Sequence, residues 1–75
     1  MNDALASLAR DSKNGDTIFI TQADQYYFVH QKRSDDLIAF PIIGLPTLDE
    51  AISYIKAYLA DHPDAGFDLS KCPTN

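Results

Sequence analysis

Cysteine and glycine are scarce in this sequence of 75 residues. The single cysteine, Cys72, excludes a disulfide within the chain and a zinc site built from several cysteines. Three glycines are too few for a glycine-rich phosphate-binding loop. No apolar run approaches the roughly 20 residues that span a bilayer, and the start of the chain lacks the basic and continuously apolar regions of a signal peptide. We therefore expect a cytoplasmic protein without a membrane partner.

Basic residues are also few. Six Lys and Arg stand against 11 Asp and Glu, which gives a net charge of −5. Proteins that bind nucleic-acid phosphates usually carry a basic stripe, so no direct nucleic-acid partner is expected. An acidic surface attracts a basic protein partner instead. Because the acids are scattered along the chain, we expect a local acidic patch rather than rows of acids that imitate a nucleic acid.

Residue types that often carry catalysis are present without a catalytic spacing. None of the five serines has a nucleophile-elbow glycine pattern. His30 and His62 are far apart and belong to no HExxH or similar metal spacing. The neighbouring carboxylates Asp35 and Asp36 fall in a predicted turn, where such pairs are usually solvated. We expect no catalytic site, no metal and no cofactor, and a protein that is not an enzyme.

The sequence contains enough hydrophobic residues to form one small core. Hydrophobic residues make up 45% of the chain, and eight residues are Tyr or Phe. This is globular composition, near the lower size limit for a fold without disulfides or metals. We predict a single domain over residues 1–75. The segment 64–75 is expected to be a mobile tail, with Phe67 and Leu69 as its anchors on the domain.

The clearest local signal is a helix over residues 47–62. Thr47 is a good N-cap, and Glu50 completes a capping box in which each side chain reaches the other's backbone amide. Leu48, Ile52, Ile55 and Leu59 share one face of this helix, with Ala51 and Tyr58 on its flank. Pro63 ends the helix because it disfavours helical geometry at the residue before it.

Three strands are predicted before this helix. β-Branched and aromatic residues dominate the segments 17–21, 26–30 and 37–42. The short connections between them make the strands antiparallel. A short helix, capped by Asn2 or Asp3, is expected to run to about Arg10. The predicted fold is α+β in the order α-β-β-β-α: a three-stranded antiparallel meander with the main C-terminal helix packed on it and a short N-terminal helix.

The predicted sheet has apolar residues on both of its faces, more than one packed helix can cover. Residues alternate between its two faces, yet neither face is cleanly polar, since Phe28 lies on the face opposite Val29. One helix covers one face. The other face must be covered by the N-terminal helix, by the tail, by a second copy of the chain or by a partner. An exposed apolar patch usually marks an interaction site.

These observations favour a non-enzymatic protein-binding module. We expect a small acidic inhibitor, of the antitoxin, immunity-protein or phage anti-defence type, that binds a basic surface of a larger, nucleic-acid-handling protein. This expectation rests on an analogy between classes of protein. The alternative is a structural or regulatory subunit that forms a homodimer through the second apolar face of the sheet.

Candidate partner-binding residues come from three segments. On the helix, Glu50, Tyr54 and Asp61 lie opposite the apolar stripe and are expected to face water. An exposed tyrosine between two acids suits an arginine-rich surface. The remaining candidates are the sheet residues Tyr26 and Phe28 and the turn residues Asp35 and Asp36.

Overall fold

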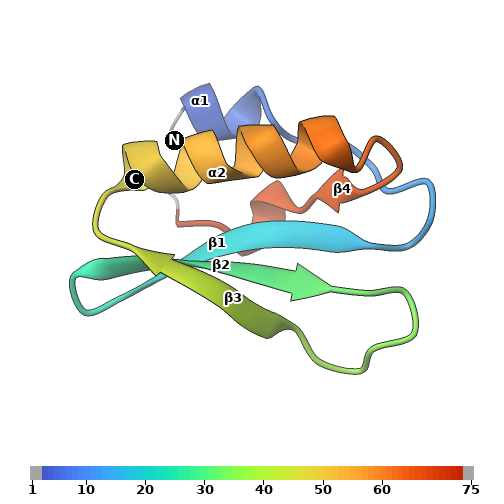
Figure 1. The fold of residues 1–75 in the computed structure, drawn as a ribbon, viewed down its shortest axis with the longest axis horizontal. Coiled ribbons are helices and arrows are strands. Elements are labelled where there is room, and N and C mark those ends of the chain that lie inside the picture. Colours follow the sequence, from blue (N-terminus) through green and yellow to red (C-terminus); the bar gives the residue numbers. More distant parts are fainter. Residues whose placement is uncertain (1–2, 74–75) are drawn as a thin grey trace.

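A computed structural model of the chain describes residues 3–73. Its elements, in chain order, are α1 (Asp3–Ala6), β1 (Thr17–Ala23), β2 (Tyr26–Lys32), β3 (Phe40–Leu45), α2 (Leu48–Asp61), β4 (Gly66–Phe67) and the short 3-10 helix η1 (Leu69–Lys71). The expected α+β fold is confirmed: β1, β2 and β3 form an antiparallel meander with α2 across one face (Figure 1). The sheet has four strands rather than three, in the order β3-β2-β1-β4.

Helix α2 begins directly after the N-cap that the sequence predicted, Thr47. The amide of Glu50 donates to Oγ1 of Thr47 at 3.2 Å, which satisfies one of the free N–H groups of the first turn. The Glu50 carboxylate accepts from the Thr47 hydroxyl at 3.1 Å, so the reciprocal bond of the capping box goes to the side chain rather than to the expected backbone amide. The predicted apolar face is confirmed by burial of Ala51, Ile52, Ile55 and Leu59.

Strands β1 and β2 form a tight hairpin. Ala23 pairs with Tyr26, which leaves Asp24 and Gln25 as the turn. Asp24 has a φ of 55°, a left-handed conformation that short polar residues such as Asp tolerate in hairpin turns. Both strands are two residues longer than the sequence pattern indicated, because pairing extends past the apolar residues to Lys32.

The predicted third strand was wrong in its boundaries. We expected it over 37–42, whereas β3 runs from Phe40 to Leu45. Its register is set by pairing with β2, in which Leu45 lies opposite Tyr27, and by a bulge beside Val29 and His30. The residues before Phe40 therefore belong to the β2–β3 loop. Pro41 lies in an edge strand, as its missing N–H requires.

The fourth strand makes residues 64–73 part of the fold. Gly66 and Phe67 pair in parallel with Thr17 and Ile18 at the far edge of the sheet. Phe67 also forms an antiparallel bridge with Arg10. Ala65, Gly66, Phe67 and Cys72 are buried, a wider anchor than the Phe67 and Leu69 contacts expected for this tail.

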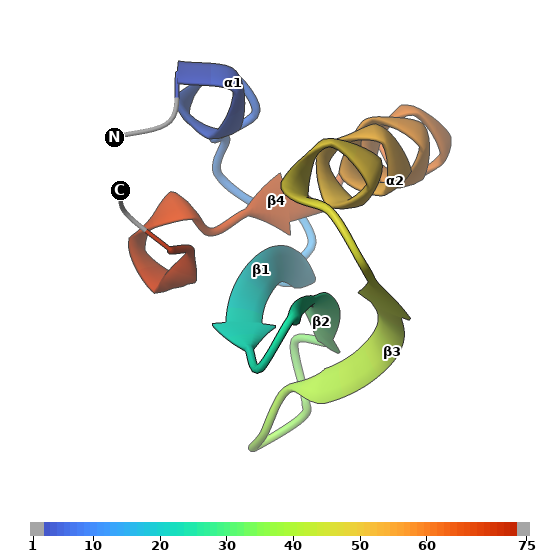
Figure 2. The same cartoon turned by 90° about the vertical axis from the view of Figure 1, so that its left-hand side faces the viewer.

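Both helices lie on the same side of the sheet (Figure 2). The buried residues Ile18, Ile20 and Val29 pack there against Ile55 of α2 and Leu5 of α1. Helix α1 is shorter than expected and ends at Ala6, and the proposed cap Asn2 lies outside the described residues. Because α1 packs on the α2 side, it does not cover the second face of the sheet.

Candidate interaction surfaces

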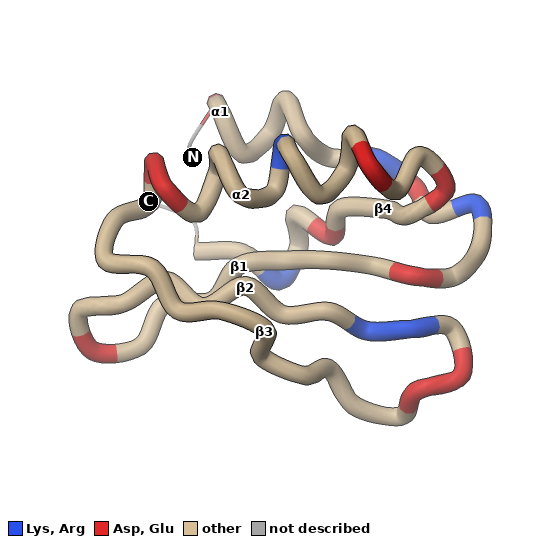
Figure 3. The backbone as a smooth tube through the Cα atoms, in the orientation of Figure 1, with Lys and Arg blue, Asp and Glu red and all other residues tan. Residues whose placement is uncertain are grey.

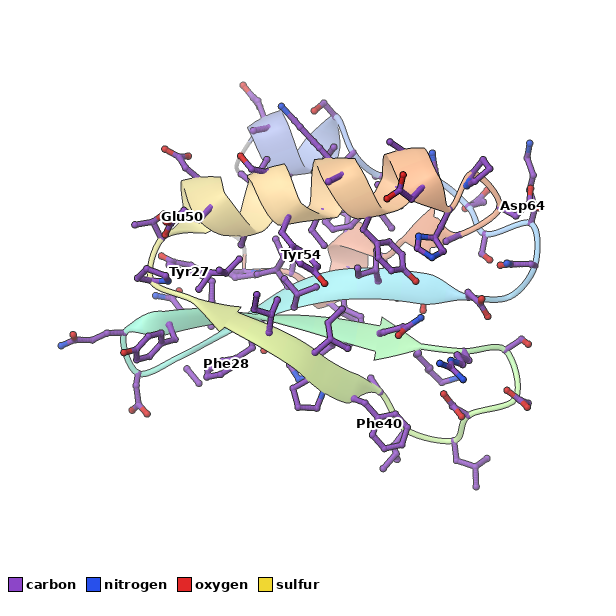
Figure 4. The ribbon with its side chains drawn as sticks, viewed as in Figure 1. Tyr27, Phe28, Phe40, Glu50, Tyr54 and Asp64 are labelled. Atoms are coloured by element: carbon purple, nitrogen blue, oxygen red, sulfur yellow. The ribbon has the colours of Figure 1, made fainter. Side chains whose placement is uncertain are left out.

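A shallow hollow lies along the C-terminal half of α2. It has a volume of about 240 Å³ and is lined by Tyr54, Ala57, Tyr58, Asp61 and His62, a set that we call the α2 hollow. Figure 4 shows Tyr54 between α2 and the strands, where it packs against the core rather than standing free in water. The expectation that Tyr54 faces water opposite the apolar stripe was therefore wrong, although Tyr54 and Asp61 both line this hollow.

The aromatic rings of the hollow are held in place by specific contacts. Nε2 of Gln31 donates to the Tyr58 hydroxyl at 2.9 Å. The rings of Tyr58 and His62 stack with centroids 4.1 Å apart. Burial raises the pKa of Tyr58, and the nearby charge of Asp16 raises it further, so this phenol stays neutral at physiological pH. The hollow is thus a fixed aromatic platform.

Carboxylates gather at the end of the molecule where α2 terminates. The loop after α2 contacts the loop before β1, since the amide of Lys13 donates to the carbonyl of Asp64 at 2.8 Å. That loop contacts the β2–β3 turn, because the amide of Ser34 donates to Oδ1 of Asp16 at 3.1 Å. Figure 3 shows acidic segments in all three loops. We call this region the acidic end; its carboxylates are Asp16, Asp35, Asp36, Asp61 and Asp64.

The candidate Glu50 lies apart from the acidic end. It is exposed in the first turn of α2. Eleven residues separate it from Asp61, which corresponds to about 16 Å along a helix at 1.5 Å per residue. The hollow is completed instead by Tyr58 and His62, which sequence reasoning had assigned to the flank and to the end of the helix. Tyr58 follows Tyr54 by four residues and His62 follows Tyr58 by four, and this repeated spacing was the signal that could have revealed them.

A second surface lies on the face of the sheet away from α2. The rings of Tyr26 and Phe28 meet there with centroids 6.2 Å apart. The Phe28 ring lies over Gly44 of β3, so closely that a Cβ on this glycine would be 2.8 Å from a ring carbon. Figure 4 shows Phe28 and Phe40 both pointing away from α2.

The large apolar side chains of this region are well exposed. The relative exposures are 50% for Tyr26, 96% for Leu37, 64% for Ile38, 51% for Phe40 and 39% for Ile42. We call these residues, together with Phe28, the open sheet face; Tyr26, Phe28, Phe40 and Ile42 belong to β2 and β3, and Leu37 and Ile38 belong to the loop between these strands. Exposed apolar patches of this kind usually mark interaction sites, so this face is a candidate.

Among residues 3–73, the segment after β4 covers the β1 side of this second face. Phe19 is 6% exposed, and the ammonium of Lys71 lies 5.1 Å from its ring centroid. His30 stacks on Phe19 with centroids 5.2 Å apart and planes inclined by 3°. The C-terminal segment therefore covers one aromatic residue of the second face and leaves the β2 and β3 side open.

The seven candidate residues thus fall into separate groups. Tyr54 and Asp61 line the α2 hollow, and Asp35 and Asp36 belong to the acidic end. Tyr26 and Phe28 lie on the opposite face, while Glu50 lies at the start of α2. Sequence position alone could not show this division, because it depends on which side of the sheet each element packs.

Comparison of the chain with known protein families found no match. Curated proteins and solved structures gave no match either. Within residues 3–73, His, Cys, Asp and Glu side chains form no group of three or more that could hold a metal ion. No helix in this described part of the chain has the length and apolar character needed to cross a membrane.

Proposed function

We propose that this chain is a non-enzymatic protein-binding module that binds a basic surface of a larger protein. The observation that supports the proposal is the α2 hollow, in which two tyrosine rings and a histidine ring lie beside the exposed carboxylate of Asp61. An arginine or lysine side chain is stabilised by an aromatic ring face and by a carboxylate at the same time. The occupant of the hollow is therefore a cationic side chain of the partner.

The charge of the surrounding surface favours the same kind of partner. The acidic end continues from Asp61 to Asp64 and, through the loop contacts, to Asp16 and the β2–β3 turn. Such a field accelerates the approach of a positively charged surface. Lys13, Lys32 and Arg33 lie in or next to the same loops, so the local excess of negative charge is moderate. The rings of the hollow provide the short-range part of the interaction.

Within this proposal the chain acts as a small antagonist, of the antitoxin, immunity-protein or anti-defence type. A basic groove that handles nucleic acid would be blocked by a compact acidic domain that occupies it. The small size and the net charge of −5 support this role. The analogy is between classes of protein and identifies no particular target.

The test is capture followed by mutation. Proteins of the host that bind the immobilised chain are identified by mass spectrometry, and the purified partner is then titrated against variants. Asp61→Lys should weaken binding at least about tenfold, because it places like charge against the basic surface. Asp3→Lys is the matched control, since it makes the same charge change at an exposed position in the first turn of α1. Equal effects of both changes, or no effect of Asp61→Lys, would rule out this surface.

A further inference from the structure

We propose that the open sheet face binds a second copy of this chain. The proposal concerns a different surface from the α2 hollow, because the two lie on opposite sides of the sheet. The open sheet face consists of Tyr26, Phe28, Leu37, Ile38, Phe40 and Ile42.

The apolar residues of this face come from two paired strands and the loop that joins them. Tyr26 contacts Phe28, and the Phe28 ring reaches across to Gly44 on the edge strand. Ile42 follows two residues earlier on the same strand, and Phe40 begins it. The surface therefore extends from the β1–β2 hairpin across β2 and β3 to the β2–β3 loop.

The exposed area matches what a dimer needs. At on the order of 150–200 Å² for a large side chain, the exposed fractions of the five most open residues correspond to roughly 450–600 Å², more than half of it from Leu37 and Ile38 in the β2–β3 loop. A standard interface buries about 800 Å² per partner, and homodimer interfaces are about 65% apolar. The open sheet face alone supplies that apolar share.

Charge decides between a second copy and a basic partner. The strands β1, β2 and β3 contain a single charged residue, Lys32, and no carboxylate. Figure 3 shows the charges gathered in the helices and loops instead. The nearest carboxylates in the chain sequence, Asp24 in the β1–β2 turn and Asp35 and Asp36 in the β2–β3 loop, lie at the ends of this face and leave its strands without a partner for a basic surface. A second copy offers an equally uncharged face, and a twofold axis makes the same patch complementary to itself.

The acids on α2 do not oppose this arrangement. Two copies that meet at their open sheet faces keep both α2 helices on the outside. Stacked sheets lie about 10 Å apart, and each helix lies one further layer out. The acids on the two α2 helices are then separated by well over the Debye length of about 8 Å at physiological salt.

Analytical ultracentrifugation of the purified chain tests the proposal. We expect a species of twice the 8.3 kDa monomer mass at micromolar concentration. Phe28→Asp and Ile42→Asp should each weaken dimerisation at least about tenfold, because a charge would be buried without a partner. Ser53→Asp is the matched control: it adds the same charge at an exposed position of α2 and should leave the dimer intact.

A second measurement uses the unaltered protein, in case an aspartate variant does not fold. A mixture of isotope-labelled and unlabelled chains should give intermolecular NMR contacts between the rings of Tyr26 or Phe28 and the side chain of Ile42. Wild-type chain that stays monomeric up to millimolar concentration would overturn the proposal, and so would a dimer whose intermolecular contacts lie elsewhere.

Discussion

Arg10 and His62 are joined across the fold: Nη2 of the Arg10 guanidinium donates to the main-chain carbonyl of His62 at 2.8 Å. The same nitrogen reaches the carbonyl of Leu59 at 3.1 Å, and Nε donates to the carbonyl of Ala65 at 2.8 Å. The last carbonyls of a helix have no partner within it and carry partial negative charge. A single side chain from the N-terminal segment therefore caps α2 and holds the start of β4.

This arrangement predicts that Arg10→Ala lowers the free energy of unfolding by about 1–3 kcal/mol, because it removes three charge-assisted hydrogen bonds that are partly exposed. Arg10→Lys should lose part of this amount, since an ammonium lacks the planar fork. Urea unfolding measures both. Arg33→Ala, which removes an exposed arginine, should stay within about 0.5 kcal/mol of wild type. An Arg10→Ala variant as stable as Arg33→Ala would contradict the capping role.

The core prediction concerns Ile55, which is 0% exposed in the centre of α2. Ile55→Ala should cost about 2–5 kcal/mol through lost burial and a cavity, enough to unfold a domain of this size in part of the population. Thr47→Ala should cost about 1 kcal/mol through the lost N-cap. Ser53→Ala on the exposed side of α2 is the control. A decrease in the free energy of unfolding below about 1 kcal/mol for Ile55→Ala would mean that this side chain is not packed in the centre of the core.

Two glycines give a paired steric test. A Cβ on Gly66 would lie 2.5 Å from the amide nitrogen of Ser12 and 2.9 Å from the carbonyl oxygen of Arg10. Backbone cannot move aside without breaking the contacts of β4, so Gly66→Ala should be strongly destabilising in thermal unfolding. Gly44→Ala meets only the ring of Phe28, which can rotate toward solvent, and should cost much less. Similar losses at both positions would show that β4 is not packed as described.

The thiol of Cys72 gives a pH dependence. Burial raises the pKa of Cys72 above its ordinary value of 9.0, an effect that the N–H of Ile20, donating to Sγ at 3.4 Å, offsets in part. Below pH 9.0 the thiol is protonated in both the folded and the unfolded chain, so its ionisation takes nothing from the free energy of unfolding. Above it the unfolded chain ionises first, and stability falls as the pH rises through the folded pKa.

Cys72→Ala should therefore flatten the loss of stability above pH 9.0, and it should be less stable than wild type at neutral pH because it leaves a small cavity. The measurement is urea unfolding at a series of alkaline pH values. Tyr58, whose pKa is raised above 10.0, adds a second decline at higher pH that Tyr58→Phe removes. An unchanged slope in Cys72→Ala would show that the thiol is not protected from ionisation in the folded chain.

Binding kinetics should separate the charge of the partner-binding surface from its aromatic platform. Glu50→Lys combined with Asp61→Lys should slow association with a basic partner, and more so at low salt, because exposed charges act mainly on the encounter. Tyr54→Ala should instead speed dissociation. It should also cost stability, since Tyr54 packs against the core, and binding is therefore measured well below its melting temperature. If all these changes leave binding intact, the α2 hollow is not the contact.

Much of the fold was readable from the sequence because its signals are local. Thr47, the apolar period through Ile55 and the stop at Pro63 define α2 within a few residues of each position. The polar turn between two β-branched and aromatic segments defined the β1–β2 hairpin in the same way. The apolar surplus on the second face of the sheet was also a property of the sequence, since alternation alone shows that neither face is polar.

Only the tertiary structure decided which distant segments meet. Pairing of Thr17 with Gly66 created the fourth strand, and pairing with β2, which includes a bulge beside His30, set the bounds of β3. Neither event has a local signal, because the energy comes from contacts between residues far apart in sequence. The same holds for the candidate sites: packing of α2 and α1 on one side of the sheet put Tyr54 and Phe28 on different surfaces and left the open sheet face uncovered by either helix (Figure 2).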